Sequence, residues 1–258
     1  MDLYAVLGSP VAHSRSPFLF AQFAAQTQQV FSYEKIETTA EQLPATLIAL
    51  KLRGGKGVNI TAPLKEIAFQ LAHETSARAK AAQAVNVLCF KENGEYYGDN
   101  VDGVGLVRDL KLNLHIDLKN KRILVIGAGG AVRGVLHSLL EEQPEEIVIT
   151  NRTPEKAELL ASQFKITSLR WDELPGHQFD LIINGTSVSR QQVALPLPNG
   201  ITRNDALCYD MVYGVENTSF QQWAEFNHAR HVQGLGMLVE QAAETFYLWR
   251  GVRPETVI

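Results

Sequence analysis

Residues 122–134, RILVIGAGGAVRG, have the types and spacing needed to bind a pyrophosphate. A buried strand runs directly into glycines and then into a helix. Gly127 permits a tight turn, Gly129 lets the backbone approach the anion, and the helix N-terminus offers free N–H groups. Val132 takes the third position of the G-x-G-x-x-G pattern, but the turn stays small and a dinucleotide site is predicted. The predicted contacts are Gly127, Ala128, Gly129, Gly130 and Ala131.

The next strand ends in TNRTPEK, residues 150–156, and this ending bears on which dinucleotide binds. NAD sites place an acidic residue there for the ribose 2′-hydroxyl, whereas this chain has Asn151, Arg152 and Thr153. A guanidinium can bind a 2′-phosphate through paired, charge-assisted hydrogen bonds. A solvated arginine is the alternative, and Thr153 could simply cap the helix that Pro154 starts. The pattern favours NADP(H) over NAD(H).

Polar residues also stand at strand ends in the first hundred residues. Each has an ordinary structural explanation, because serine and threonine cap helices, asparagine makes turns and lysine is usually solvated. Their repeated occurrence at strand ends that face the same side of a sheet predicts a shared pocket. These residues are Ser14, Ser16, Asn59, Thr61, Lys65, Asn86, Asn100 and Asp102.

The stretch GDNVDGVG, residues 98–105, carries the last two of them among three glycines. Asn100 and Asp102 are typical of a turn, and equally of an acid placed at the edge of a pocket. Val101 between them fits neither interpretation well.

The elements that position these residues follow from the periodicity of apolar side chains. Ser16 is a candidate N-cap, with Pro17 at the first helical position. The first part of the chain is predicted to form strands over 3–8, 31–37, 57–60, 86–90 and 95–100, and helices over 16–29, 41–53 and 61–72.

The second part alternates strands with helices, which predicts a parallel, doubly wound sheet. A final helix over 236–251 could pack on either part. The predicted order is a helix over 102–114, a strand–turn–helix over 119–142, a strand–helix over 145–164, strands over 179–187 and 206–214, and a helix over 217–227.

The bulk composition of the 258 residues indicates a globular protein. Apolar residues make up 45%, the formal net charge is −4 and the pI is about 6.0, so disorder and nucleic-acid binding are not indicated. Cys89 and Cys208 lie in apolar runs and suggest small core residues. With no membrane-length segment and no leader pattern, we expect a cytoplasmic protein without membrane partners.

Taken together, these stretches resemble the shikimate dehydrogenase family from end to end. The matching motifs are GSPVAHSRSP, GVNITAPLKE, AVNVL, GDNVDGVG, IGAGGAVRG, NRT, NGTS, YDMVY and GLGMLVEQAAETFYLWRG, in the family's order and spacing. The resemblance implies an α/β enzyme that reduces 3-dehydroshikimate to shikimate with NADPH. It implies a substrate domain over 1–101 and 236–258, with the final helix returning to it, and a Rossmann-like NADP domain over 102–235.

The resemblance also implies roles for individual residues. Lys65 and Asp102 form the catalytic pair, and Ser14 and Ser16 hold the substrate carboxylate. The residues around the ring and its hydroxyls are Asn59, Thr61, Asn86, Asn100, Asp102, Tyr213 and Gln241. The NADP contacts beyond the glycine turn are Asn151, Arg152, Thr153 and Lys156 at the adenosine phosphate, with Met211 and Gly234 at the nicotinamide. No metal is predicted, and the expected state is a monomer or homodimer.

The chain departs from the family pattern at three places. Valine stands at positions 87 and 101, where the family usually has threonine, and VSRQQ (188–192) replaces a glycine-containing turn. Valine has threonine's shape without its hydroxyl, so substrate choice could differ. Two alternatives therefore stay open: a paralogue acting on quinate or another hydroxy acid, with relaxed cofactor choice, and a non-catalytic NADP(H)-binding sensor.

Overall fold

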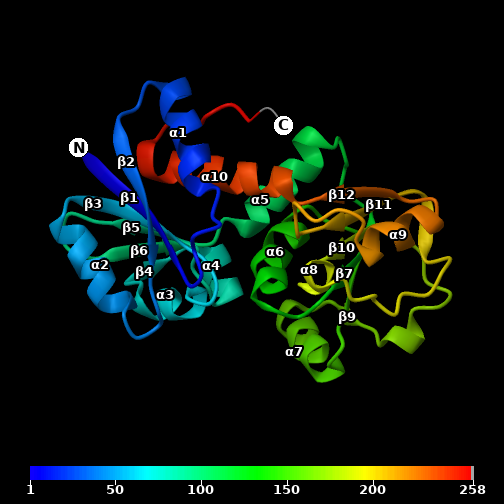
Figure 1. Cartoon of the computed structure of the whole chain (residues 1–258). Helices are drawn as coiled ribbons and strands as arrows, with labels where there is room; N and C mark the ends of the chain where they lie inside the picture. Colours follow the sequence, from blue (N-terminus) through cyan, green and yellow to red (C-terminus); the bar gives the residue numbers. More distant parts are fainter. Residues whose placement is uncertain (257–258) are drawn as a thin grey trace. The chain divides into compact units, whose positions relative to one another are not determined.

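The computed structural model describes residues 1–256, which divide into two compact units (Figure 1). Within the described residues, unit 1 comprises residues 1–105 and 239–256, and unit 2 comprises Leu106–Leu238. These bounds differ by a few residues from the predicted domains because the helices α5 (Asp102–Arg108) and α10 (Leu235–Arg250) run continuously across both boundaries. Residues 257 and 258 of the predicted substrate domain lie outside the described residues.

Unit 1 contains a six-stranded mixed sheet in the order β2-β1-β3-β5-β6-β4. The strand bounds are β1 Asp2–Gly8, β2 Phe31–Glu37, β3 Gly55–Ile60, β4 Glu74–Thr75, β5 Val87–Phe90 and β6 Tyr96–Asp99. β1 is parallel to β2 and β3, while β5 is antiparallel to both β3 and β6. As a result, β1, β3 and β6 end at the same edge of the sheet, and β5 begins there.

Helices cover both faces of this sheet because its central strands are apolar on both sides. Along β1, Leu3, Ala5 and Leu7 face the core under α2, while Tyr4 points to the other face and stacks on Trp249 of α10 at 4.4 Å. On that second face, α1 and α10 lie side by side (Figure 1). The helices are α1 Ser16–Thr27, α2 Leu43–Leu52, α3 Lys65–Leu71 and α4 Ala77–Ala82, together with α10.

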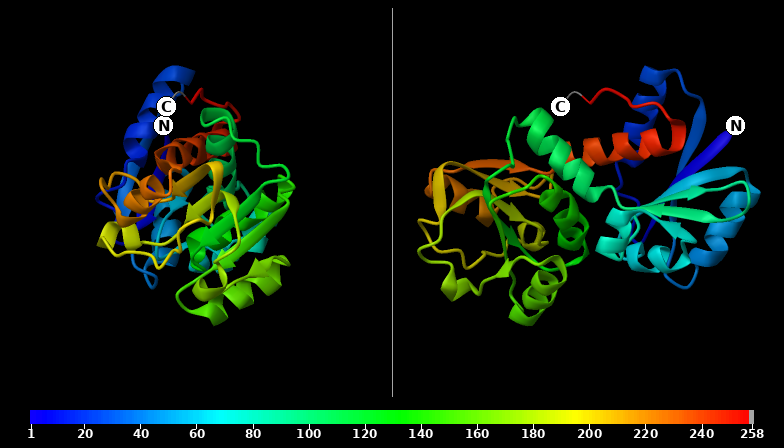
Figure 2. Two further views of the ribbon diagram at one scale, coloured as in Figure 1. Left: turned by 90° about the vertical axis from the view of Figure 1, so that its right-hand side faces the viewer. Right: turned by 180° about the vertical axis from the view of Figure 1, so that it is seen from behind.

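Unit 2 is the predicted doubly wound domain. Its six strands are all parallel in the order β12-β11-β10-β7-β8-β9, which is the dinucleotide-binding topology. Alternate residues of the strands feed one core with α6 and α7 and another with α9, and the helices cover both faces (Figure 2). The elements are β7 Arg122–Ile126, α6 Gly130–Glu141, β8 Glu146–Thr150, α7 Pro154–Phe164, β9 Thr167–Ser168, β10 Phe179–Asn184, α8 Val188–Gln191, β11 Thr202–Asp210, α9 Ser219–Phe226 and β12 Arg230–Gln233.

Several local predictions were wrong. Ser16 is the first helical residue and not the N-cap, which is Arg15. Thr153 is the N-cap residue of α7, as the sequence allowed, but its side chain makes no capping hydrogen bond. The helix predicted over 61–72 begins only at Lys65, because residues 61–64 form a turn around Pro63. The short elements β4, α4, α8, β9 and β12 were not predicted, since they carry too few residues for a periodic pattern.

The helix predicted over 102–114 is α-helical only as far as Arg108 and continues as a π-helix over Asp109–Asn113. The buried Asp109 carboxylate accepts hydrogen bonds from the Tyr209 hydroxyl (2.6 Å) and from the Asn113 amide (2.9 Å). It also packs so closely on Gly236 that a Cβ there would lie 1.9 Å from its oxygen. Only glycine therefore fits at position 236, in the first turn of α10.

Both cysteines are unpaired, as expected of core residues, and burial raises the pKa of each thiol to about 12. Across residues 1–256, none of the helices has the length and apolar character that a membrane span requires.

The environment of His231 on β12 predicts that the stability of unit 2 depends on pH. Its imidazole packs edge-on against Phe220, and burial lowers its pKa below 6.5, an effect that the charge of Asp210 partly offsets. The folded state therefore binds this proton less tightly than the unfolded chain does, and the associated stability is present above pH 6.5 and lost as the pH falls. We expect His231→Leu to show a smaller decrease in the free energy of unfolding between about pH 7.5 and pH 5.5. Urea titrations at both pH values measure this, and identical decreases in the two proteins would contradict it.

Candidate active site

The polar residues of unit 1 lie at the sheet edge where β1, β3 and β6 end. Ser14 and Ser16 follow β1, Thr61 and Lys65 follow β3, and Asp102 follows β6. Asn86 immediately precedes β5, which starts at this edge because it runs antiparallel to its neighbours. Thr61 lies against the end of β1, since a Cβ on Gly8 would be 2.3 Å from its methyl carbon.

Lys65 and Asp102 form an ion pair at this edge. The Lys65 ammonium donates to Asp102 Oδ2 at 2.6 Å, with 24% of the lysine and 7% of the aspartate side chain exposed. The other carboxylate oxygen, Oδ1, accepts from the Asn86 side-chain amide at 2.8 Å. Asp102 is therefore held from two sides, and the ammonium keeps two further N–H bonds for a ligand.

Asn86 and Asn100 hold the backbone that carries Asp102. Asn86 Oδ1 accepts from the Val101 N–H at 2.9 Å, and Asn100 Oδ1 accepts from the Asp102 N–H at 3.2 Å. Asn100 Nδ2 donates to the Ala84 carbonyl at 3.1 Å, and the residue is fully buried. Asn100 therefore supports the backbone of Asp102, and its predicted contact with substrate stays a prediction.

A second group links β3 to α1 and α10. The buried Tyr33 hydroxyl donates to Asn59 Oδ1 at 2.7 Å, while Asn59 Nδ2 donates to Thr245 Oγ1 at 3.3 Å and weakly to the Asn86 carbonyl. Burial raises the pKa of Tyr33, and a hydrogen bond with Ser16 partly offsets this rise. The Ser14 hydroxyl in turn donates to that of Ser16 at 3.2 Å. Tyr33 was missed, although a tyrosine on the covered face of an alternating strand needs a hydroxyl partner.

Asp99, directly before Asn100, was also missed. Its buried carboxylate accepts from the Ser76 hydroxyl, from Arg78 through two bonds of 2.8 and 2.7 Å, and from the Asn100 N–H at 2.7 Å. Arg78 also reaches Glu244 of α10 at 3.2 Å. The acidic residue in the motif GDN was the only sequence feature that pointed to Asp99. Its hydrogen-bond partners could not be predicted from residue spacing.

The remaining predicted substrate residues are Gln241 and Tyr213. Gln241 is half-buried on α10 in unit 1. Tyr213 belongs to unit 2, where the Arg190 guanidinium lies 5.9 Å from its ring centroid. Their predicted contacts with substrate stay predictions.

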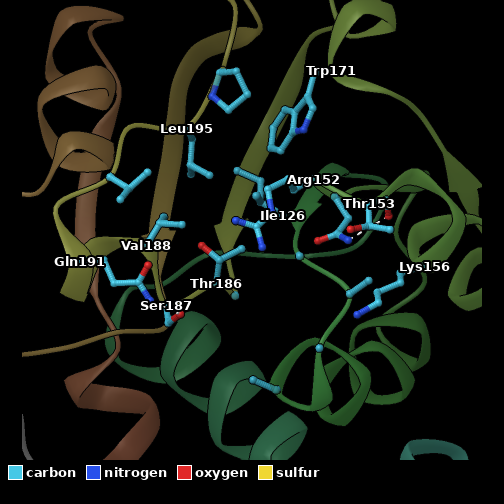
Figure 3. Close-up of a pocket in the computed structure, with 18 of the residues that line it drawn as sticks. Ile126, Arg152, Thr153, Lys156, Trp171, Thr186, Ser187, Val188, Gln191 and Leu195 are labelled. Atoms are coloured by element: carbon cyan, nitrogen blue, oxygen red, sulfur yellow. Dashed lines mark hydrogen bonds between the residues drawn. The ribbon is translucent and has the colours of Figure 1, made fainter.

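Unit 2 contains a cavity of about 610 Å³ at the carboxyl ends of β7, β8 and β10 (Figure 3). It includes nine of the predicted cofactor residues, namely Gly127, Ala128, Gly129, Gly130, Ala131, Asn151, Arg152, Thr153 and Lys156. Gly127 has a positive φ of 109°, and a Cβ there would lie 3.0 Å from the Thr186 methyl carbon. Gly129 and Gly130 face open space at the N-terminus of α6. This is an unobstructed cradle of the kind that a pyrophosphate fills.

The other end of the cavity combines two of the predicted cofactor residues with apolar residues that the sequence did not single out. Arg152 and Lys156 are exposed cations at its rim, and no carboxylate follows β8 before Glu155 (Figure 3). Trp171, Leu195 and Pro196 add apolar surface there. Met211 and Gly234 do not line this cavity, but they contact each other and lie beside its wall. A Cβ on Gly234 would be 2.8 Å from the Met211 carbonyl, and one on Gly185 would be 3.2 Å from the Met211 sulfur.

Family models match most of the chain. They are the shikimate dehydrogenase substrate binding domain over residues 6–88, shikimate / quinate 5-dehydrogenase over 109–195, and the shikimate 5′-dehydrogenase C-terminal domain over 234–257. A protein of Nitrosospira multiformis named shikimate dehydrogenase (NADP(+)) is 50% identical over 99% of this chain and 94% of its own length. The chain belongs to the shikimate dehydrogenase family. A protein of Cellvibrio japonicus with the same name is 49% identical with the same coverage.

Solved structures similar to this chain agree with this assignment. An Ael1 enzyme from Pseudomonas putida has a TM-score of 0.94 and 42% identity, covering 99% of this chain and 96% of that one. A shikimate 5-dehydrogenase from Thermus thermophilus, in complex with NADP(H) and shikimate, has a TM-score of 0.89 and 35% identity, covering 99% and 95%. The predicted family and the predicted two-domain α/β fold are confirmed.

The two valines at which the chain was predicted to depart from the family pattern are buried. Val87 is 0% and Val101 is 1% exposed, and they flank Asn86 and Asp102. Their methyl groups pack inside the protein behind the polar edge, so they do not line an accessible surface.

Proposed function

We propose that the chain catalyses the reversible NADP-dependent interconversion of 3-dehydroshikimate and shikimate. The observation that carries this proposal is the Lys65–Asp102 ion pair, held by Asn86 at the carboxyl edge of the unit 1 sheet. The names of the relatives that are about 50% identical, and the open cradle in unit 2, support the same function. Retention of this catalytic pair argues against a non-catalytic sensor.

NADP(H) fits the residues that line the unit 2 cavity. The diphosphate would lie over Gly129 and Gly130, where no side chain intrudes and the α6 N-terminus points. Arg152 and Lys156 would bind the 2′-phosphate, for which their charge and exposure suit them. When bound, the cofactor supplies or accepts a hydride at the substrate carbon.

Lys65 would supply the proton that the substrate oxygen needs during reduction. Its ammonium also stabilises negative charge developing on that oxygen, so that it acts as general acid and electrostatic partner. Asp102 orients the ammonium through Oδ2 and would accept a hydrogen bond from a neighbouring substrate hydroxyl. Ser14 and Ser16 offer hydroxyl donors for the carboxylate at the same edge.

An assay of NADP⁺ and NAD⁺ reduction with shikimate, and then with quinate, tests the proposal. We expect turnover with shikimate and NADP⁺ to exceed the other three combinations. NADP(H) binding without turnover of either acid would favour the sensor, and preferred turnover of quinate would favour the paralogue. A cytoplasmic location and a monomer or homodimer remain predictions.

The buried valines favour shikimate over an altered substrate. Because neither side chain lines an accessible surface, we expect Val101→Thr, alone and with Val87→Thr, to leave KM for shikimate within about twofold. The added hydroxyls should instead lower the free energy of unfolding by about 1–3 kcal/mol. This is the cost of burying a hydroxyl that makes no hydrogen bond. Steady-state kinetics and urea titrations measure both effects. A KM that falls about tenfold would mean that the hydroxyl reaches the substrate.

A further inference from the structure

The helix α8 stands in the segment where this chain departs from the family pattern, and it forms part of the cavity wall in unit 2. Thr186, Ser187, Val188 and Gln191 line the cavity (Figure 3). Ser189 lies within the same turn but does not line the cavity, and it is fully buried. Its side chain is therefore available to fix α8 from behind.

Ser189 is bonded to a buried pair at the ends of two neighbouring strands. Its hydroxyl donates to Asp210 Oδ2 and accepts from Asn184 Nδ2 at 3.2 Å. Asn184 and Asp210 are register partners in β10 and β11, and both are at most 1% exposed. Burial raises the pKa of Asp210, and the Ser189 hydroxyl and the Val212 N–H partly offset this rise.

The same pair holds two segments on the cofactor side. Asn184 Oδ1 accepts from the backbone N–H of Thr186 at 3.1 Å and from its hydroxyl at 2.6 Å. Asp210 Oδ1 accepts from the Val212 N–H at 3.0 Å, which fixes the turn that carries Met211. Ser189 thus completes a hydrogen-bond network. The network connects α8 to Thr186, which lines the cavity, and to the turn that carries Met211.

We propose that Ser189 is a positioning residue for NADP(H) binding, because its two hydrogen bonds hold α8 and the adjoining cavity wall ready for the cofactor. This inference rests on the proposed function. Without the hydroxyl, Asp210 loses a donor inside the protein and α8 loses its tether to the strands. Cofactor binding would then have to order α8 and the adjoining cavity wall. Because this ordering costs free energy, affinity for the cofactor would fall.

The test compares Ser189→Ala with Ser138→Ala. Ser138 is a matched control, because it is a buried serine of the same unit whose hydroxyl has no hydrogen-bond partner within residues 1–256. The dissociation constant for NADPH is measured by fluorescence titration, alongside kcat at saturating substrates and KM for shikimate. We expect Ser189→Ala to weaken NADPH binding about five- to tenfold, with kcat and KM for shikimate within about twofold. Ser138→Ala should bind NADPH like the wild type.

Ser189→Cys provides a second measurement if the alanine variant does not fold. The thiol is similar in shape but a weak donor, so we expect an intermediate loss of NADPH affinity. Unchanged NADPH affinity in the folded Ser189 variants, or an equal loss in Ser138→Ala, would overturn the inference. Failure of the wild type to oxidise shikimate with NADP⁺ would instead overturn the proposed function.

Discussion

Lys65→Ala is expected to reduce kcat for shikimate oxidation by roughly 10²- to 10⁴-fold, while KM for shikimate rises less than about tenfold. The substitution removes the proposed proton donor and the positive charge that is proposed to stabilise the reacting oxygen. Ser14 and Ser16, which are proposed to hold the carboxylate, remain in place, so binding suffers less than turnover. Steady-state kinetics in both directions of the reaction measure the two effects separately.

Lys80→Ala is the matched control for this experiment. Lys80 is an exposed lysine of α4 in the same unit, and its loss changes the net charge equally. We expect it to leave kcat and KM near those of the wild type. A near-normal kcat in Lys65→Ala would remove Lys65 from the catalytic role.

Asp102→Asn is expected to lower kcat by roughly 10- to 10³-fold. The carboxylate accepts from Lys65 through Oδ2 and from Asn86 through Oδ1, and an amide cannot accept on both atoms. The Lys65 ammonium would then lose its fixed orientation, and a proposed acceptor for a substrate hydroxyl would be lost. Both kcat and kcat/KM for shikimate should fall.

The double variant Lys65→Ala with Asp102→Asn distinguishes a catalytic pair from two independent residues. If the two act as a unit, the double variant should be about as slow as Lys65→Ala alone. Multiplied losses would contradict the pair. Asp172→Asn is the matched control for Asp102→Asn. It makes the same substitution at a carboxylate that is largely exposed and belongs to unit 2.

The unit 2 architecture could be predicted from the sequence because its signals are local. Long apolar runs followed by turns and amphipathic helices identify parallel strands, and the glycines of 127–130 need only their own neighbours to be interpreted. The nine predicted cofactor residues that line the cavity lie in two such turns. The order of the strands then follows from the common topology of these sheets.

The hydrogen-bond partners in the site could not be predicted, because they lie far apart in the sequence. Tyr33 bonds to Asn59 across 26 residues, and Arg78 to Asp99 across 21. The same holds for Asp210 and Ser189, whose contact depends on strand register and on a short helix without a periodic pattern. The hydrogen bonds of Asn100 to Ala84 and Asp102 were not predicted either, since a residue type does not tell which way the side chain points.

The discontinuity of unit 1 has a consequence for the order of folding. Unit 2 is a continuous segment, Leu106–Leu238, whereas α10 reaches unit 1 only at the end of the chain. The aromatic face formed by Tyr4, Phe20 and Phe23 stays uncovered until Phe246 and Trp249 have been synthesised. These contacts have a high sequence separation, which slows their formation. During synthesis, unit 2 can therefore complete its core before the last helix of unit 1 has been made.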